Sequence, residues 1–197
     1  MIMKVKKTKI KFVDLKKYGF VVEPRYYWWG WSKSPKILGR ESLAKALVRA
    51  KKFLPAKWNF KVWDCRRPRQ INELMIKSFF RRIKQAYPKL SAKEIKRLVV
   101  RFAGSVPSPK QDKNLWTHYN GGAIDLTLVD EKGDEVYMGT EYDDLTQKAA
   151  LGYFENKKNL SALNKIAKNN RHILSRAMKK AGFGEYRYEW WHWWFEK

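Results

Sequence analysis

The chain has 197 residues, of which 44% are hydrophobic and 15% aromatic, and its formal net charge at neutral pH is +24. This length is typical of one domain with one core, so we expect a single domain over residues 1–197. The apolar content excludes a disordered chain, and no apolar run approaches the roughly 18 residues that a membrane-spanning helix requires. The composition therefore indicates a globular protein.

The large positive charge comes from 43 basic against 19 acidic residues. The basic residues are spread along the chain, and no block of five or six stands together. We interpret them as a solvated basic surface without a dedicated partner. The alternative is an attraction to nucleic acid or to an acidic cell-wall polymer, which salt would weaken.

The first eleven residues alternate lysines with single apolar residues and lack the apolar run and cleavage site of a secretory signal. We therefore expect a cytoplasmic protein. Periplasmic or cell-wall action stays open if the sequence is a mature form. Cys65 is the only cysteine, so an intramolecular disulfide is excluded, whereas the oligomeric state is not determined by the sequence.

Periodicity predicts alternating helices and strands along the chain. Helices are expected where apolar residues recur every three or four positions, at residues 41–54, from Pro68 to about 87, from a capping box at Ser91 to about 103, and at 159–181. Strands are expected at residues 58–63, 123–129, 136–138 and 186–195, with a loop at 104–114 and a turn at 130–134. The mixture and the turn at Gly133 favour an α+β fold with a central, mainly antiparallel sheet and flanking helices.

Two of the three histidines stand in short segments rich in groups that bind zinc or transfer protons. His118 precedes Asp125 in a segment with two glycines, and His192 follows Glu189 near the C-terminal end. A catalytic zinc site has about three protein ligands, commonly imidazoles and carboxylates, and an open position for water. His118, Asp125 and His192 supply such a set, and Glu189 is a candidate to accept a proton from the bound water.

The spacing within each segment does not suit a regular strand. His118 and Asp125, like Glu189 and His192, are separated by an odd number of positions, so a straight strand would direct the members of each pair to opposite faces. Their convergence requires a bend at the glycine pair of the first segment. In the second segment it requires a bulge or turn near residues 190–191.

Four segments carry a resemblance to a known family. They are residues 64–68 (Asp-Cys-Arg-Arg-Pro), 118–128 (beginning His-Tyr-Asn-Gly-Gly-Ala-Ile-Asp), 138–143 (Met-Gly-Thr-Glu-Tyr-Asp) and 189–192 (Glu-Trp-Trp-His). In this order they resemble the motif set of the zinc D-alanyl-D-alanine dipeptidases, over about residues 40–195. That family is related to the peptidoglycan D,D-carboxypeptidases, and the resemblance implies a Hedgehog-like metallopeptidase fold.

The resemblance implies a role for each matching residue. His118, Asp125 and His192 would hold one zinc ion per chain, and Glu189 would act as general base and then as general acid. Arg67 would stabilise the developing oxyanion, a role that suits a fixed guanidinium in a dry site.

Two further residues are implicated in binding the substrate. Asp143 would pair with the free ammonium group of a dipeptide, which would explain a preference for dipeptides over longer chains. The family pattern often has serine two positions before the first histidine, where this chain has Trp116. Trp116 is therefore a candidate substrate-binding residue at which specificity differs.

Several of these residues also have structural interpretations. Arg67 could be a surface arginine near a helix start, and Asp143 with Asp144 could form a solvated pair or a helix cap. The tryptophans of residues 190–194 are expected in the core and pocket wall rather than as a nucleic-acid platform. A nucleophilic role for Cys65 is disfavoured, although two neighbouring arginines could lower its pKa.

Together these features predict a zinc peptidase that hydrolyses D-Ala-D-Ala, a small D-amino-acid dipeptide, by means of a zinc-activated water. The alternative within this class is a peptidoglycan D,D-carboxypeptidase or an L,D- or D,D-endopeptidase that acts on stem peptides. The alternative from another class is a basic polyanion-binding protein with a structural zinc.

Overall fold

A five-stranded sheet forms the centre of the computed structural model, which describes residues 10–103 and 117–196. Its strands, in spatial order, are β2 (Val21–Val22), β4 (Asn59–Asp64), β5 (Ala123–Val129), β7 (His192–Trp194) and β6 (Gly184–Glu185). β2 runs parallel to β4, and the other neighbouring strands are antiparallel. The expected α+β fold with a mainly antiparallel sheet is confirmed.

A second, two-stranded sheet pairs β1 (Phe12–Asp14) with β3 (Leu38–Arg40) in antiparallel register. It adjoins the segment that leads into β5, because the Arg40 amide donates a hydrogen bond to the Gly121 carbonyl at 3.3 Å. The short helix α1 (Arg25–Trp28) lies in the chain between β2 and β3. The N-terminal part thus supports the loop that precedes the central strand.

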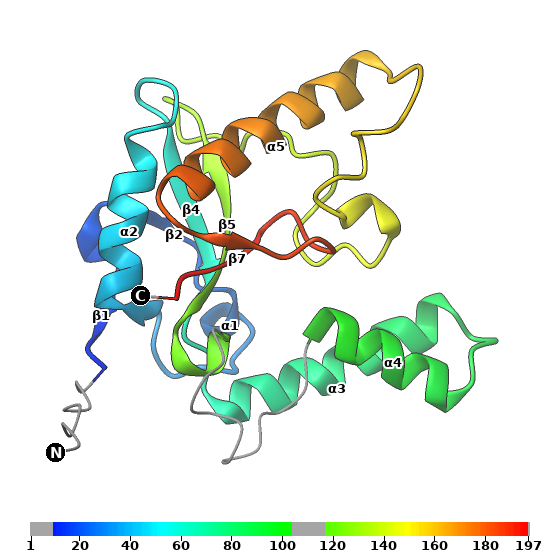
Figure 1. Ribbon diagram of the computed structural model, residues 1–197. Coiled ribbons are helices and arrows are strands. Elements are labelled where there is room, and N and C mark those ends of the chain that lie inside the picture. The colour runs from blue at the N-terminus through cyan, green and yellow to red at the C-terminus, as the bar shows by residue number, and fades with distance from the viewer. Residues whose placement is uncertain (1–9, 104–116, 197) are drawn as a thin grey trace, which may run out of the picture.

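The helices form two groups, of which one packs on the sheet and the other projects from it (Figure 1). α2 (Glu41–Lys51) and α5 (Ala162–Lys180) pack together and bury their apolar faces in the main core, while α3 (Arg69–Ala86) and α4 (Ala92–Ala103) form a separate helical hairpin. The predicted capping box opens α4, since the Ser91 amide donates to Glu94 Oε2 at 2.8 Å. None of the helices in the described ranges is long and apolar enough to cross a bilayer.

The hydrophobic core has two parts. The main part joins α2 and α5 to the sheet and includes the fully buried Phe60, Leu126 and Trp193. The smaller part lies within the hairpin, where Phe79 and Ile83 of α3 contact apolar residues of α4. Trp190, Trp191 and Trp193 are each at most 2% exposed, which confirms the expected core placement for these three, whereas Trp194 is only partly buried.

Some element boundaries differ from the sequence-based prediction. No strand forms at residues 136–138, and the isolated bridge to β5, between Val129 and Glu135, lies just before them. Of the predicted strand at 186–195 only β7 forms, because Glu189 and the residues around it lie in turns; β6 comes before this range, at residues 184–185. The first predicted helix ends at Lys51 instead of residue 54. The predicted loop at 104–114 lies outside the described residues.

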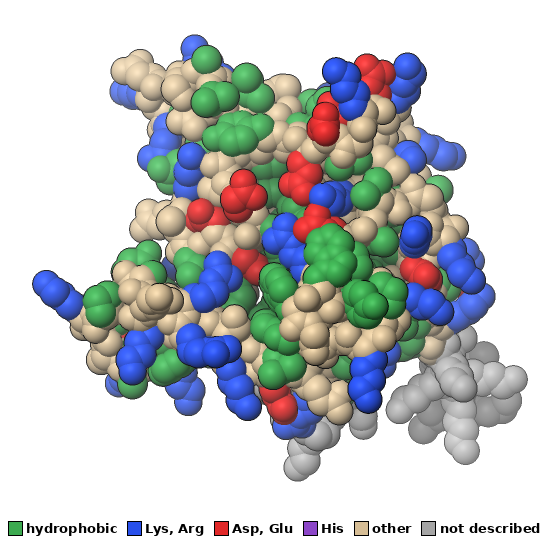
Figure 2. Space-filling view, turned by 180° about the vertical axis from the view of Figure 1, so that it is seen from behind, with side chains coloured by type: hydrophobic (Ala, Val, Ile, Leu, Met, Phe, Trp, Pro, Cys, Tyr) green, Lys and Arg blue, Asp and Glu red, His purple; other side chains and the backbone are tan. Residues whose placement is uncertain are grey.

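Basic side chains are widely distributed over the surface. On the face drawn in Figure 2, Lys and Arg side chains occupy much of the periphery, whereas Asp and Glu side chains gather mainly towards the middle and one edge. This distribution agrees with the spread of basic residues along the sequence.

Candidate metal centre and active site

Three adjacent strands place acidic and imidazole side chains in one row. Asp64 at the end of β4 is the register partner of Asp125 in β5, and Asp125 is in turn the partner of His192 in β7. The register shifts between Val62 and Asp64, and such a bulge re-aims the side chain that follows it. Sheet pairing therefore brings together residues that are distant in the sequence.

His118 reaches the same place from a turn before β5. It begins a short 3-10 helix, His118–Asn120, that ends at Gly121 with φ 70°, in the left-handed region. A side chain at position 121 would also meet the ring of Phe12 at 2.8 Å. The predicted bend at the glycine pair is confirmed, and it allows His118 and Asp125 to converge.

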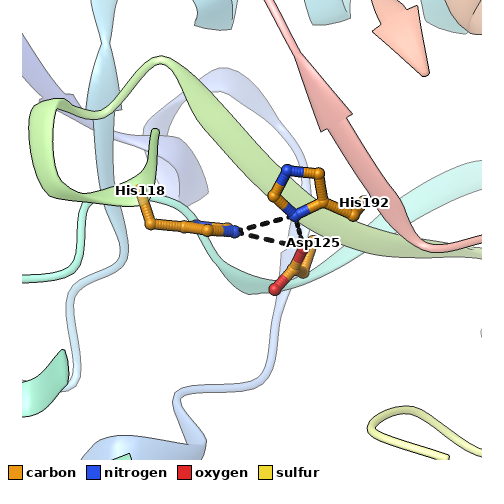
Figure 3. Close-up of side chains that lie close together, drawn as sticks. All are labelled: His118, Asp125 and His192. Atoms are coloured by element: carbon orange, nitrogen blue, oxygen red, sulfur yellow. Dashed lines mark hydrogen bonds and ion pairs between the residues drawn. The ribbon is translucent and has the colours of Figure 1, made fainter. Parts of the chain in front are cut away.

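The three side chains converge with the spacing of metal ligands (Figure 3). His118 Nε2 lies 3.1 Å from His192 Nδ1 and 3.3 Å from Asp125 Oδ1, and His192 Nδ1 lies 3.0 Å from Asp125 Oδ1. Bonds of about 2.0 to 2.1 Å to a tetrahedral zinc would separate neighbouring ligand atoms by roughly 3.3 Å. One ligand atom from each residue lies within 4.8 Å of the others, so the donor set and spacing fit a divalent cation.

Two further contacts orient these groups. The other ring nitrogen of His118, Nδ1, lies 2.9 Å from the Cys65 carbonyl, which fixes Nδ1 as the donor and leaves Nε2 unprotonated in the neutral ring. The Tyr142 hydroxyl donates to Asp125 Oδ2 at 3.1 Å. Burial raises the pKa of Tyr142 well above its usual value, so this hydroxyl stays a donor.

The three groups have different proton affinities. Burial lowers the pKa of His118, but the negative charges of Asp125 and Asp64 outweigh it, so the net pKa is raised. The pKa of His192 is lowered, mainly by burial. Burial would raise the pKa of Asp125, yet the two imidazoles outweigh it, so the pKa is strongly lowered. Asp125 is therefore a carboxylate that is ready to bind a cation.

Glu189 lies beside this cluster, in the turn that leads into β7. Residues 190–191 form the predicted turn, and Glu189 Oε2 is 4.0 Å from His192 Nδ1. Glu189 is 5% exposed. Burial, together with the charges of Asp125 and Asp143, raises its pKa well above the usual value. This environment suits a carboxyl group that takes up and returns a proton.

Arg67 is a buried residue and not a surface arginine, since it is 5% exposed. Its Nε donates to Asp64 Oδ2 at 2.7 Å, and one terminal nitrogen donates to Asn72 Oδ1 at 3.2 Å. The other terminal nitrogen lies 3.7 Å from Asp125 Oδ2. Burial opposes the charge, but Asp64 outweighs it and holds the pKa of Arg67 well above its usual value. A fixed guanidinium thus faces the cluster.

Asp143 lies on the loop between β5 and α5. Its backbone has φ 61°, and its carbonyl accepts a hydrogen bond from Arg82 of α3 at 3.1 Å. Burial and the charge of Asp125 raise the pKa of the Asp143 carboxyl to about 7. This group belongs to the electrostatic environment of Glu189 rather than to a freely solvated acidic pair. The other predicted substrate-binding residue, Trp116, lies outside the described residues.

The guanidinium of Arg171 on α5 anchors the same loop at both ends. Arg171 is 1% exposed and donates to the carbonyls of Met138, Ala150 and Lys148 at 2.8, 2.7 and 2.9 Å. Among the described residues it forms no ion pair with a carboxylate, and burial lowers its pKa to about 10. Arg171 therefore holds the segment that carries Tyr142 and Asp143.

Sequence reasoning did not assign several residues that shape the site. Asp64 directly follows the predicted strand at 58–63 and Tyr142 lies inside one of the four family segments, yet the sequence indicates a role for neither. Asn72 and Arg171 stand in ordinary helical patterns, where no sequence signal distinguishes them. Cys65 was expected to feel two arginines, but burial raises its pKa well above the usual value, so the thiol is inert.

A comparison with protein families agrees with this geometry. A family model described as D-ala-D-ala dipeptidase, of the M15 peptidases, matches residues 30–196. The chain belongs to this family. It is therefore a member of a peptidase family whose enzymes are metallopeptidases, and the resemblance seen in the sequence is confirmed.

Individual relatives carry the same description. The chain is 26% identical to a D-alanyl-D-alanine dipeptidase of Synechocystis over 187 residues, covering 81% of this chain and 69% of the relative. It is 27% identical to one of Enterococcus faecalis and 29% identical to one of Enterococcus faecium, each covering 80% of this chain and 72% of the relative. The similarity thus extends over most of both chains.

Proposed function

We propose that the chain, acting as a single domain, is a zinc-dependent D,D-dipeptidase that hydrolyses D-Ala-D-Ala. The observation that supports this best is the convergence of His118, Asp125 and His192, with ligand atoms within 4.8 Å, in a chain of the dipeptidase family. The names of the relatives support the dipeptide substrate. The buried Glu189 and Arg67 beside the cluster support hydrolysis rather than a purely structural metal site.

The three converging residues would hold the metal through His118 Nε2, His192 Nδ1 and Asp125 Oδ1. A zinc ion bound there supplies Lewis acidity for the scissile carbonyl and for a water molecule. Asp125 keeps its second oxygen for the Tyr142 hydroxyl, and His118 keeps its second nitrogen for the Cys65 carbonyl. These contacts hold the ligands in place before the substrate arrives.

Glu189 moves the proton in this mechanism. Its Oε2 accepts a proton from the attacking water and later transfers it to the amine that leaves when the peptide bond breaks. The guanidinium of Arg67, held by Asp64 and Asn72, stabilises the negative oxygen of the tetrahedral intermediate. Because Arg67 is already oriented, little reorganisation is needed when that charge develops.

Asp143 binds the free ammonium group of the dipeptide. Its position on a loop anchored by Arg171 and by Arg82 supports this assignment. An ion pair at this point favours substrates that have their amino terminus directly at the site. Trp116, two positions before His118, is proposed as a further substrate contact on the strength of the family pattern alone.

The proposal is tested with wild-type protein and the variant Glu189→Gln. Wild type should carry about one zinc per chain and release D-alanine from D-Ala-D-Ala. Glu189→Gln should keep its zinc and lose activity by a factor of about 100 or more. Glu185→Gln, which removes a partly exposed carboxylate that pairs with Lys179, is the matched control and should stay active.

The outcomes separate the alternatives. Retained activity in Glu189→Gln would remove this residue from the mechanism. Full activity after complete removal of metal by a chelator would exclude a metallopeptidase. Hydrolysis of stem peptides without hydrolysis of the dipeptide would replace the dipeptidase by a carboxypeptidase or endopeptidase.

A further inference from the structure

The side chain of Arg25 lies over two stacked aromatic rings that adjoin the candidate metal centre, and it has no role in the mechanism above. Its guanidinium carbon is 5.2 Å from the ring centroid of Trp63 and 5.0 Å from that of Tyr142. The two rings stack with centroids 4.6 Å apart, at an angle of 20°. A guanidinium within about 6 Å of an aromatic ring is attracted by the negative charge on the ring face. Arg25 is therefore bound to the stack of Trp63 and Tyr142.

A carboxylate holds the same guanidinium in place. Arg25 Nε donates a hydrogen bond to Glu23 Oε1 at 2.6 Å, and Glu23 Oε2 pairs with Lys61 of β4. The amide of Glu23 donates to the Val62 carbonyl at 2.9 Å, so Glu23 is itself fixed to the sheet. Burial would raise the pKa of Glu23, but Lys61 and Arg25 outweigh it, so the net pKa is lowered. The Glu23 side chain thus stays charged and anchors Arg25 to β4.

The stack transmits this anchoring to a proposed metal ligand. Tyr142 is 7% exposed, and its hydroxyl donates to Asp125 Oδ2 at 3.1 Å. Asp125 Oδ1 is thereby left to face the two imidazoles (Figure 3). A Tyr142 ring that tilted or withdrew would release Oδ2, and with it the orientation of the carboxylate. The contacts therefore form one chain from Glu23 through Arg25 and Tyr142 to Asp125.

The surroundings of Arg25 differ from those of an ordinary surface arginine. Its side chain is 24% exposed, and both rings beneath it are buried. Loss of solvent strengthens the attraction between a cation and a ring. The charge of Arg25 also acts on the carboxyl group of Asp143, which follows Tyr142 in the chain. Arg25 therefore lies close to both functional residues of this loop.

We propose that Arg25 is a positioning residue of the metal site. It holds the Tyr142 ring against Trp63, keeps the Tyr142 hydroxyl on Asp125 Oδ2, and so fixes Asp125 in the orientation that binds a cation. The inference rests on the proposed function, because it concerns a zinc ligand assigned there. Arg25 acts at a distance from the metal in this role, so its effect must pass through Tyr142.

A double-mutant cycle tests this order of contacts. The measured quantity is the zinc dissociation constant of the full chain, obtained by competition with a chelator. Arg25→Met keeps a long unbranched side chain but removes the charge, and it should raise the dissociation constant about fivefold. In the Tyr142→Phe background the same change should no longer weaken zinc binding, because the hydroxyl that transmits the effect is absent. An equal weakening in both backgrounds would show that Arg25 does not act through Tyr142 and would overturn the inference.

Further variants separate a positioning role from a change in charge. Loss of a positive charge would by itself tighten the binding of a cation, so the expected weakening is opposite in sign to the simple electrostatic effect. Arg25→Lys keeps a cation over the rings and should bind zinc within about twofold of wild type. Lys180→Met, the matched control, removes an exposed cation 5.1 Å from the ring centroid of Phe53 and should leave the dissociation constant unchanged. A similar weakening in this control would overturn the inference. Should Arg25→Met not fold, Arg25→Gln takes its place in the cycle.

Hydrolysis of the dipeptide, measured on the same zinc-loaded proteins, separates this inference from the proposed function. If wild type hydrolyses D-Ala-D-Ala but its zinc dissociation constant does not respond to Arg25→Met, the inference alone is overturned. If zinc binding shows the expected coupling between Arg25 and Tyr142 but no D-alanine is released, the inference is supported while the proposed function fails. A chain that binds no zinc would overturn both.

Discussion

The hydroxyl of Tyr142 donates a hydrogen bond of 3.1 Å to Asp125 Oδ2, while Oδ1 of the same carboxylate faces the two imidazoles. This contact joins the loop after β5 to the candidate metal centre. Trp63 stacks on the Tyr142 ring with centroids 4.6 Å apart, so the hydroxyl has little freedom to move away. A residue outside the ligand set therefore determines how Asp125 is oriented.

Replacing Tyr142 with phenylalanine should weaken metal binding. Tyr142→Phe keeps the ring packing but removes the donor, and loss of such an outer contact typically costs about tenfold or more in metal affinity. The zinc dissociation constant, measured by competition with a chelator, should rise accordingly. Tyr137→Phe is the control, because Tyr137 is 44% exposed. An unchanged dissociation constant in Tyr142→Phe would show that Asp125 is held by other contacts.

Local patterns in the sequence predicted much of the fold and the convergence of the site. The glycines at 121 and 122 indicated a bend, and the odd spacing of Glu189 and His192 indicated a turn; both features are present. These predictions succeeded because they rest on backbone geometry within a few residues. The capping box at Ser91 succeeded for the same reason.

Contacts between distant segments could not be read from the sequence in this way. The row of Asp64, Asp125 and His192 depends on the register of three strands, and a single-residue slip would disperse it. The strand expected at 136–138 is absent because pairing with β5 is limited to one isolated bridge at the preceding residue, Glu135. Arg171 gave no signal, since its three acceptors are backbone carbonyls, which every sequence offers.

Metal binding should weaken as the pH falls. The pKa of His118 is raised by Asp125 and Asp64 despite burial, so below that pKa a proton competes with zinc for Nε2. The apparent affinity should fall about tenfold per pH unit in this range, and more steeply where His192, whose pKa is lowered, also takes up a proton. For the metal-free protein, the contribution of His118 to the free energy of unfolding changes with pH in the opposite direction. Protonated His118 stabilises the fold at low pH, and this stabilisation is lost as the pH rises through its folded-state pKa.

Chelator competition between about pH 5.5 and 8 measures this dependence. His172→Gln is the matched control, since His172 is an exposed histidine on α5 that pairs with Glu155 and lies away from the cluster. The variant should reproduce the wild-type profile. An affinity that does not vary with pH would mean that His118 is already neutral throughout this range.

Asp143→Asn should stabilise the metal-free protein at high pH. The pKa of Asp143 is raised to about 7, so the folded chain binds more protons than the unfolded chain below that pH, and stability falls as the pH rises towards 7. The variant avoids this cost. At pH 8 its free energy of unfolding should exceed that of wild type by on the order of 2 kcal/mol, allowing for partial exposure.

Urea unfolding of both proteins at pH 5 and pH 8 provides the comparison, and the gain should shrink at the lower pH. The same variant should bind D-Ala-D-Ala more weakly, because an amide cannot pair with the ammonium group. Greater stability together with weaker substrate binding would identify Asp143 as a residue kept for function. A variant that is less stable than wild type at pH 8 would contradict the raised pKa.

Removing the guanidinium of Arg171 should release the loop that carries Tyr142 and Asp143. Arg171→Gln leaves the carbonyls of Met138, Lys148 and Ala150 without their buried donors, and each loss costs about 1 to 3 kcal/mol. We expect the free energy of unfolding to fall by about 3 kcal/mol or more. Hydrogen exchange at residues 138–150 should increase more than exchange in α2, because the anchor is local.

Two further variants show whether the loss of stability is specific to the Arg171 guanidinium. Arg176→Gln removes an exposed arginine of the same helix and should leave both measurements unchanged. Arg171→Lys keeps the charge but cannot reach three carbonyls in a fixed fork, so it should recover only part of the stability. Where the lysine variant folds, its zinc affinity should fall in the same direction as that of Tyr142→Phe, because the loop no longer fixes the Tyr142 hydroxyl against Asp125. Equal exchange in the loop of all four proteins would mean that packing, and not Arg171, holds it in place.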